Sequence, residues 1–190
     1  EKYFKKEVSP QHLEDIAKEI RKEQWLIQKN SGLDFIPSND FSFYDNMLDT
    51  AVLLNVIPKR YSRLNLSLID TYFAMARGYQ GGAGDVKALG MKKWFNTNYH
   101  YIVPEIDDDT DIKLAGTKPL DEFLQAKSLG IQTKIVVIGA FTFLKSAKFT
   151  GKKKASDFVD AMIEAYSRLI AEAENKGVYW IQFDEPCLVC

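Results

Sequence analysis

Residues 178–186, with the sequence VYWIQFDEP, constrain the fold of this chain more than any other segment. Their apolar side chains run without interruption into two carboxylates, Asp184 and Glu185, followed by a proline. Such a strand is typical of the centre of a parallel sheet that is covered on both faces. Enzymes built on parallel sheets keep their sites at the C-terminal ends of the strands, where these carboxylates would emerge. The segment therefore predicts a ligand-binding α/β protein.

A second segment, residues 94–105 (WFNTNYHYIVPE), has the same layout around a predicted strand at 99–103. Asn98 offers an amide donor and acceptor, and His100 an acid or a base. Either Lys93 or Lys92 offers a cation for an anionic ligand. For any one of these residues a structural role, as a strand cap or beside core aromatics, is the simpler explanation. As a cluster they indicate a binding site.

Asp184 and Glu185 are neighbours on an extended strand end, so their side chains point in opposite directions. They are therefore not a paired acid and base. The sequence predicts that one of them accepts hydrogen bonds from a polar ligand while the other binds protein. The alternative is that both anchor loops or an arginine.

The composition is that of an ordinary globular domain, with 46% hydrophobic and 27% charged residues in a chain of 190. Its 25 Lys and Arg nearly balance its 26 Asp and Glu, so nothing favours nucleic acid or an anionic membrane as a partner. The longest apolar run, 135–144, is shorter than the ~18 residues that span a bilayer. Two cysteines and no leader segment favour the cytoplasm. Because the chain starts at Glu1 and ends directly after a strand, both ends are expected to be cut.

Helical and extended segments alternate along the chain. Helices are predicted at 10–32, 45–55, 67–77, 120–129 and 156–176, and strands at 33–37, 99–103, 134–139 and 178–186. One stripe of the first helix collects Leu13, Ile16, Ala17, Ile20 and Ile27, and one face of the last collects Phe158, Val159, Met162, Ile163, Tyr166, Leu169 and Ile170. Repeated helix, glycine and strand units call for a parallel sheet with crossover helices, in an open sheet or a (β/α)8 barrel. A complete barrel usually needs ~250 residues, so under the barrel interpretation this chain is about half of one.

Three other patterns have weaker functional interpretations. Cys187 and Cys190 form a C-x-x-C that follows a strand and a proline rather than opening a helix, and a metal would need two more ligands. The glycines within 78–84 do not follow a strand, so they are predicted to form a flexible connection rather than a phosphate loop. The acidic segment 107–111 lacks the glycine and distal glutamate of a calcium loop and is predicted to be solvated. No residue of the chain is predicted to bind a metal.

Several stretches resemble the N-terminal domain of the cobalamin-independent methionine synthases, 5-methyltetrahydropteroyltriglutamate:homocysteine methyltransferases. They are KKWFNTNYHYIVPE from Lys92, DTYFAMARG from Asp70, NDFSFYDNMLDTA from Asn39, GAFTFL from Gly139 and WIQFDEP from Trp180. These blocks follow the family's order over nearly the whole chain. Among the departures, Asn39 stands where the family commonly has glycine, which asparagine can replace because it enters the left-handed region.

The resemblance implies a cytoplasmic enzyme with two (β/α)8 barrels facing each other. It would transfer a methyl group from 5-methyltetrahydropteroyltri-L-glutamate to homocysteine, with zinc bound by the C-terminal catalytic barrel through ligands outside this chain. Residues 1–190 would be about half of the N-terminal barrel, a fragment inactive alone. Lys93 and Asn98 match the family's contacts to the folate polyglutamate, with His100, Asp184 and Glu185 as secondary candidates. An ammonium and an amide suit a chain of γ-carboxylates.

Two other functions stay open. A stand-alone barrel of the uroporphyrinogen decarboxylase type would need no metal and would come from a shorter reading frame. A noncatalytic folate or polyanion-binding module would bind through Lys93 and Asn98 without any chemistry. Half a barrel would also leave two sheet edges unpaired, so that a homodimer of the fragment through these edges is expected.

Overall fold

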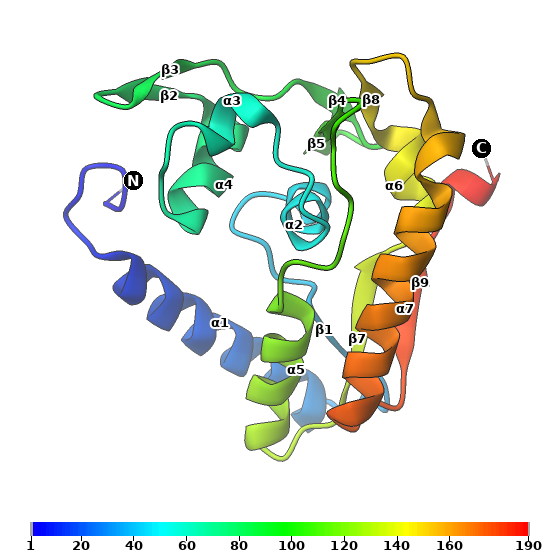
Figure 1. The fold of residues 1–190 in the computed structure, drawn as a ribbon. Coiled ribbons are helices and arrows are strands. Elements are labelled where there is room, and N and C mark those ends of the chain that lie inside the picture. The colour runs from blue at the N-terminus through cyan, green and yellow to red at the C-terminus, as the bar shows by residue number, and fades with distance from the viewer. Residues whose placement is uncertain (1, 190) are drawn as a thin grey trace.

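The computed structural model describes residues 2–189, in which helices and short strands alternate (Figure 1). The helices are α1 (Pro10–Asn30), α2 (Asn46–Leu53), α3 (Lys59–Ser62), α4 (Leu68–Arg77), α5 (Lys118–Ser128), α6 (Ala140–Ser146) and α7 (Val159–Asn175), with 3-10 turns η1 (Ala155–Phe158) and η2 (Pro186–Val189). The strands are β1 (Ile36–Ser38), β2 (Tyr79–Gly81), β3 (Gly84–Val86), β4 (Met91–Lys93), β5 (His100–Ile102), β6 (Glu105–Ile106), β7 (Thr133–Ile138), β8 (Lys148–Phe149) and β9 (Ile181–Asp184). Within this range no helix is both long and apolar enough to cross a membrane.

Strands β1, β7 and β9 form a parallel sheet in that order. Ile36 pairs with Thr133, and Ile135 pairs with Ile181. Because the strands are parallel, their C-terminal ends meet at one edge of the sheet. Figure 1 shows α5 and α7 running alongside β7 and β9. The predicted α/β class with parallel strands and helical crossovers is confirmed at this level, whereas the half barrel stays a prediction.

The main core lies between this sheet and its helices. Phe123 of α5, Ile135 of β7 and Met162 of α7 belong to one apolar cluster and are almost completely buried. A second cluster joins α2 to α4 around Leu48 and Met75. Burying one such side chain stabilises a fold by about 1.5–3 kcal/mol. The first cluster packs α5 and α7 against the sheet, and the second packs α2 against α4.

Side-chain caps set the starts of three predicted helices. Ser9 ahead of α1 and Ser67 ahead of α4 each accept a hydrogen bond from the backbone N–H three residues later. Asp45 does the same for α2. Capping satisfies an N–H that has no partner inside the helix. These three helix starts are confirmed.

Strand β9 differs from the central, doubly covered strand predicted at 178–186. It lies at one edge of the sheet, and within residues 2–189 β7 is its only strand partner. Its faces are also incompletely covered, since Phe183 within the strand is 42% exposed and Trp180, just before it, is 61% exposed. The prediction of a strand buried on both faces is wrong for the described chain, because an apolar sequence does not specify which neighbour covers it.

The predicted strand at 99–103 also pairs differently. It forms β5, which runs antiparallel to β4 and lies outside the β1-β7-β9 sheet. The prediction that this strand joins a parallel sheet is wrong, because the connection 94–99 is too short for the crossover that parallel strands need. A parallel pair forms just after it, between β6 and β8.

The glycine-rich segment forms the β2–β3 hairpin rather than a flexible connection. Tyr79 pairs with Val86, and Gly81 pairs with Gly84. Gly78 has a φ of +80°, and a Cβ there would lie 2.9 Å from the carbonyl oxygen of Val86. The prediction is wrong because the residues that favour loops also favour tight hairpin turns.

The apolar stripes predicted on the first and last helices are only partly buried. In α1 the buried residues are Ala17, Arg21 and Trp25, whereas Ile16, Ile20 and Ile27 are exposed. On α7 the buried residues include Met162, Tyr166 and Leu169, whereas Val159, Ile163 and Ile170 are exposed. Each helix therefore has a second apolar stripe that the described residues do not cover.

Candidate functional site

The predicted site residues Lys93, Asn98 and His100 lie together on the β4–β5 hairpin. Lys93 pairs directly with His100 across the hairpin, so their side chains are on the same face. Asn98 lies in the connecting turn, and its carbonyl oxygen is 3.1 Å from Nδ1 of His100. All three residues are exposed. The hairpin thus brings an ammonium, an amide and an imidazole to one accessible tip.

Hydrogen bonds fix the backbone of this turn. The Trp94 N–H donates to the Tyr99 carbonyl at 2.7 Å. Thr97 donates to the Trp94 carbonyl from its N–H at 3.1 Å and from its hydroxyl at 2.6 Å. Phe95 adopts the left-handed region, with a φ of +52°. The turn has a defined shape although its polar side chains face solvent.

Two contacts anchor the hairpin to the rest of the fold. The Ile102 N–H donates to Oδ2 of Asp45 at 2.9 Å, and the Tyr101 hydroxyl donates to the carbonyl of Ser146, the last residue of α6, at 3.0 Å. The Trp94 ring meets the Tyr101 ring edge to face, with 5.4 Å between centroids. In Figure 1 the hairpin lies on the same side of the sheet as α6, beyond the C-terminal end of β7. The sequence predicted a site at this end.

Burial alters the acid–base properties of groups beside the hairpin. Asp45 is 2% exposed, and burial raises its pKa to about 6 despite the opposing effect of the hydrogen bonds from Leu48 and Ile102. Burial, helped by the charges of Asp45 and Asp49, raises the pKa of Tyr99 to about 12. At pH 7 Tyr99 is therefore neutral, and Asp45 is mostly ionised.

Glu185 binds the first turn of α6. Its two carboxylate oxygens accept the N–H groups of Phe141 at 3.0 Å and Thr142 at 2.7 Å. A Cβ at Gly139 would overlap this carboxylate, so glycine is required for the approach. Of the two neighbouring acids, Glu185 is the one with the structural role. The signal for it in the sequence is the glycine that directly follows the β7 strand.

Asp184 ends β9, and its Oδ1 accepts a hydrogen bond from Nε2 of Gln182 at 2.7 Å. Helix α6 connects this strand end to the hairpin, since Glu185 binds its first turn and Tyr101 binds its last residue. Asp184 and the hairpin therefore flank the same short helix. A role of Asp184 in ligand binding stays a prediction.

A buried charged network follows β1, and the sequence did not indicate it. Nζ of Lys118 lies 3.1 Å from Oε1 of Glu122 and 3.2 Å from Oδ2 of Asp49. It also donates to Oδ1 of Asn39 at 2.9 Å. Asn39 has a φ of +63°, which confirms its predicted tolerance of the left-handed region. The spacing of four residues between Lys118 and Glu122 is the one signal in the sequence that points to this network.

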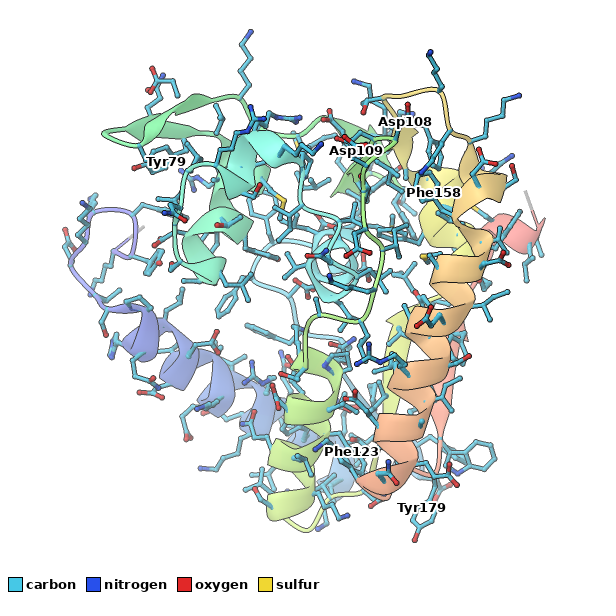
Figure 2. All side chains as sticks on the ribbon, in the orientation of Figure 1. Tyr79, Asp108, Asp109, Phe123, Phe158 and Tyr179 are labelled. Atoms are coloured by element: carbon cyan, nitrogen blue, oxygen red, sulfur yellow. The ribbon has the colours of Figure 1, made fainter. Side chains whose placement is uncertain are left out.

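The acidic segment 107–111 is not simply solvated. Asp108 accepts the backbone N–H groups of Lys152 and Lys153, each at 2.7 Å, and these bonds lower its pKa. Asp109 pairs with Lys59 at 2.5 Å, which lowers the pKa of that carboxyl as well. Figure 2 shows both aspartates beside the turn that follows β8. The segment therefore joins two loops across the surface.

Within residues 2–189, no group of three or more His, Cys, Asp or Glu side chains is arranged to hold a metal ion. The thiol of Cys187 lies 3.9 Å from the Ser146 hydroxyl, and its backbone N–H donates to Oγ1 of Thr142 at 3.2 Å. Cys190, the other half of the C-x-x-C, is outside the described residues. The described residues do not fit a zinc ion.

The sequence of this chain matches the model of one protein family over its whole length. The model of the cobalamin-independent synthase N-terminal domain matches residues 1–190. The chain therefore belongs to the family of cobalamin-independent synthases, as a part of their N-terminal domain. This confirms the family predicted from the sequence blocks, and it favours a synthase over a decarboxylase-type barrel.

Particular relatives carry the name 5-methyltetrahydropteroyltriglutamate--homocysteine methyltransferase. The chain is 53% identical over 189 residues to the protein of that name from Streptococcus pneumoniae serotype 19F (strain G54). It is 54% identical over 193 residues to that of Bifidobacterium adolescentis and 52% identical over 189 residues to that of Streptococcus thermophilus. Each match covers 100% of this chain and 25% of the relative. The chain thus spans about a quarter of the length of these proteins.

Proposed function

We propose that this chain is part of an enzyme that transfers the methyl group of 5-methyltetrahydropteroyltriglutamate to homocysteine, forming methionine. The relatives that bear the corresponding name match the whole chain at more than 50% identity. Within that enzyme the chain would bind the polyglutamate tail of the methyl donor. The observation that carries this proposal is the exposed hairpin tip that presents Lys93, Asn98 and His100 together.

The chemistry of the tip suits a γ-linked polyglutamate. Each glutamate of the tail carries a free carboxylate, which the ammonium of Lys93 can pair with. The amide of Asn98 can donate to a carboxylate or a peptide carbonyl and accept from a peptide N–H. The imidazole of His100 adds a further polar group on the same face. Asp184 stays a secondary candidate, whereas the oxygens of Glu185 are already bonded to α6.

The parent architecture is also a proposal. The β1-β7-β9 sheet with its flanking helices would form part of a (β/α)8 barrel, working in the cytoplasm. The greater length of the relatives supports a further, C-terminal domain as the partner of this segment. We propose that this domain is a catalytic barrel that binds zinc through residues outside this chain. In the isolated chain the exposed edge of β9 would pair with a second copy, which light scattering at rising concentration would detect.

Replacing Lys93 with alanine in the full-length polypeptide is expected to weaken triglutamate binding about tenfold at low salt, because one charge-assisted contact is lost. The difference should shrink as salt is added, because the site is exposed and its charges are screened. Isothermal titration with the triglutamate would measure both effects. The matched control is Lys92→Ala, since Lys92 pairs with Tyr101 on the opposite face of β4. Equal affinities for wild type and Lys93→Ala would remove Lys93 from the site.

The isolated chain is expected to show no turnover with homocysteine, the methylated folate and added zinc. The physical reason is that its described residues hold no cluster suited to the metal that would activate the homocysteine thiol. A methionine assay with the purified chain, beside the full-length polypeptide as positive control, checks this. Methionine formed by the chain alone would place the chemistry within this segment and contradict the proposal.

A further inference from the structure

We propose that Asp45 is a positioning residue that holds the β4–β5 hairpin in its ligand-binding shape; the inference rests on the proposed function. Asp45 is not on the hairpin but precedes α2. Its Oδ1 accepts the Leu48 N–H at 2.9 Å, which caps α2, and its Oδ2 accepts the Ile102 N–H at 2.9 Å, which anchors β5. One carboxylate thus joins segments that are 57 residues apart.

The anchor lies at the base of the hairpin, and the candidate ligand contacts lie at its tip. Ile102 pairs with Met91 at the open end of the two strands, whereas Lys93 pairs with His100 next to the turn. Ile102 is 1% exposed, so its N–H has no access to water if Asp45 stops accepting. An unsatisfied buried N–H is costly, and the strand would shift to relieve it. Any such shift at the base moves the tip.

Both bonds are strongest with the ionised carboxylate, whose two oxygens only accept. A protonated carboxyl group keeps an O–H donor on one oxygen, and that oxygen then faces an N–H, donor against donor. Because burial raises the pKa of Asp45 to about 6, the group takes up a proton as the pH falls through that value. We expect one of its two hydrogen bonds to backbone N–H groups to weaken in consequence. The cap of α2 can keep the remaining oxygen, so the Ile102 anchor is the bond that yields.

Other titratable groups face Asp45. Asp49 lies on α2, the helix that Asp45 caps, Tyr72 faces Asp45 from α4, and Tyr99 and Tyr101 face it from the hairpin. The pKa of each of the three tyrosines is raised above its ordinary value of 10.0, so none of them titrates near pH 6.

The contribution of Asp45 to stability changes with pH in the opposite sense to its expected effect on binding. A carboxyl whose pKa is raised from 3.8 contributes to stability in full below that value and loses this contribution as the pH rises through about 6. Weaker binding on acidification would therefore not arise from unfolding caused by Asp45.

The test compares triglutamate binding by wild type and Asp45→Asn in the full-length polypeptide between pH 5 and 8. Asparagine is a good helix cap and keeps the Leu48 bond, but its NH₂ group would face the Ile102 N–H. The variant is expected to bind about tenfold more weakly at pH 7.5. Wild type should lose affinity as the pH falls through about 6, the pKa of Asp45, whereas the variant should lack this loss. Amide hydrogen exchange at Ile102 should be faster in the variant.

Two further variants separate positioning from general stability. Asp45→Ser also keeps the cap, but one hydroxyl cannot reach both amides, so it should behave like Asp45→Asn. Ser67→Ala removes the cap of α4, away from the hairpin, and should lower the melting temperature without changing affinity.

Folded Asp45 variants with wild-type affinity and an unaltered pH profile would overturn the inference. If neither variant folds, a wild-type affinity that does not fall below pH 6 would overturn it. If Lys93→Ala also binds like wild type, the proposed function fails as well; if Lys93→Ala binds weakly, only the role of Asp45 fails.

Discussion

Replacing Glu122 with alanine is expected to lower the free energy of unfolding by about 3–5 kcal/mol, the cost of removing one member of a buried ionic network. Glu122 is 3% exposed. Its carboxylate lies 3.1 Å from Nζ of Lys118 and 3.7 Å from the guanidinium of Arg21, and it accepts the Asn39 N–H at 3.0 Å. Alanine would leave the guanidinium of Arg21 without its carboxylate partner and the backbone N–H of Asn39 without its acceptor. Lys118 would keep Asp49.

The loss comes from the abandoned partners and not from the charge of Glu122 itself. Burial raises the pKa of Glu122 although Lys118 and Arg21 oppose the shift, so its ionised form is costly in this position. Urea unfolding of the full-length polypeptide would measure the change in the free energy of unfolding, taken from the transition in which this domain unfolds. Glu122→Gln keeps an acceptor for Asn39 and should lose less. Glu164→Ala, at an exposed position of α7, should stay within about 0.5 kcal/mol of wild type. A loss from Glu122→Ala as small as that of this control would contradict the network's role.

Replacing Trp25 with alanine is expected to cost about 3–5 kcal/mol, as for other large core side chains. Trp25 is 2% exposed and packs in a small cluster with Ile36, Ala126 and Ile131. Its indole N–H donates to the Pro37 carbonyl at 2.9 Å. The side chain therefore holds α1 against β1 both by packing and by a hydrogen bond to the strand.

Thermal and urea unfolding would again give the measurement. Trp25→Phe keeps most of the packing but leaves the Pro37 carbonyl without its donor, and should cost about 1–3 kcal/mol. The control is Trp180→Ala, because Trp180 is 61% exposed and its loss removes little buried area. If Trp25→Ala were no more destabilising than Trp180→Ala, α1 would not be held to the sheet by this residue.

The sequence predicts most of the helices and one strand well, because their signals are local. Ser9, Asp45 and Ser67 each cap a helix through a backbone N–H three residues later. The strand predicted at 134–139 is observed as β7, Thr133–Ile138. The wrong predictions concern which strands pair with each other. The direction in which β5 pairs, and whether β9 has a strand on each side, depend on where other segments of the chain lie. No local pattern contains that information.

The same distinction applies to the candidate site. Lys93, Asn98 and His100 lie within eight positions of one another, so their grouping could be predicted from sequence; their function remains a proposal. The contact of Asp45 with Ile102 spans 57 residues, and that of Lys118 with Asn39 spans 79. Both are polar contacts made by buried or partly buried groups, and neither has a motif. Only the fold reveals that Asp45 anchors the β4–β5 hairpin and that Lys118 binds the segment after β1.

The close approach of Glu185 to Gly139 has a consequence for how this protein can vary. A methyl group at position 139 competes for the volume that the carboxylate fills, so an alanine there requires the Glu185 side chain either to move off the first turn of α6 or to be shorter. The tolerance of each position thus depends on the residue at the other, and the order in which two changes occur decides whether the intermediate is stable.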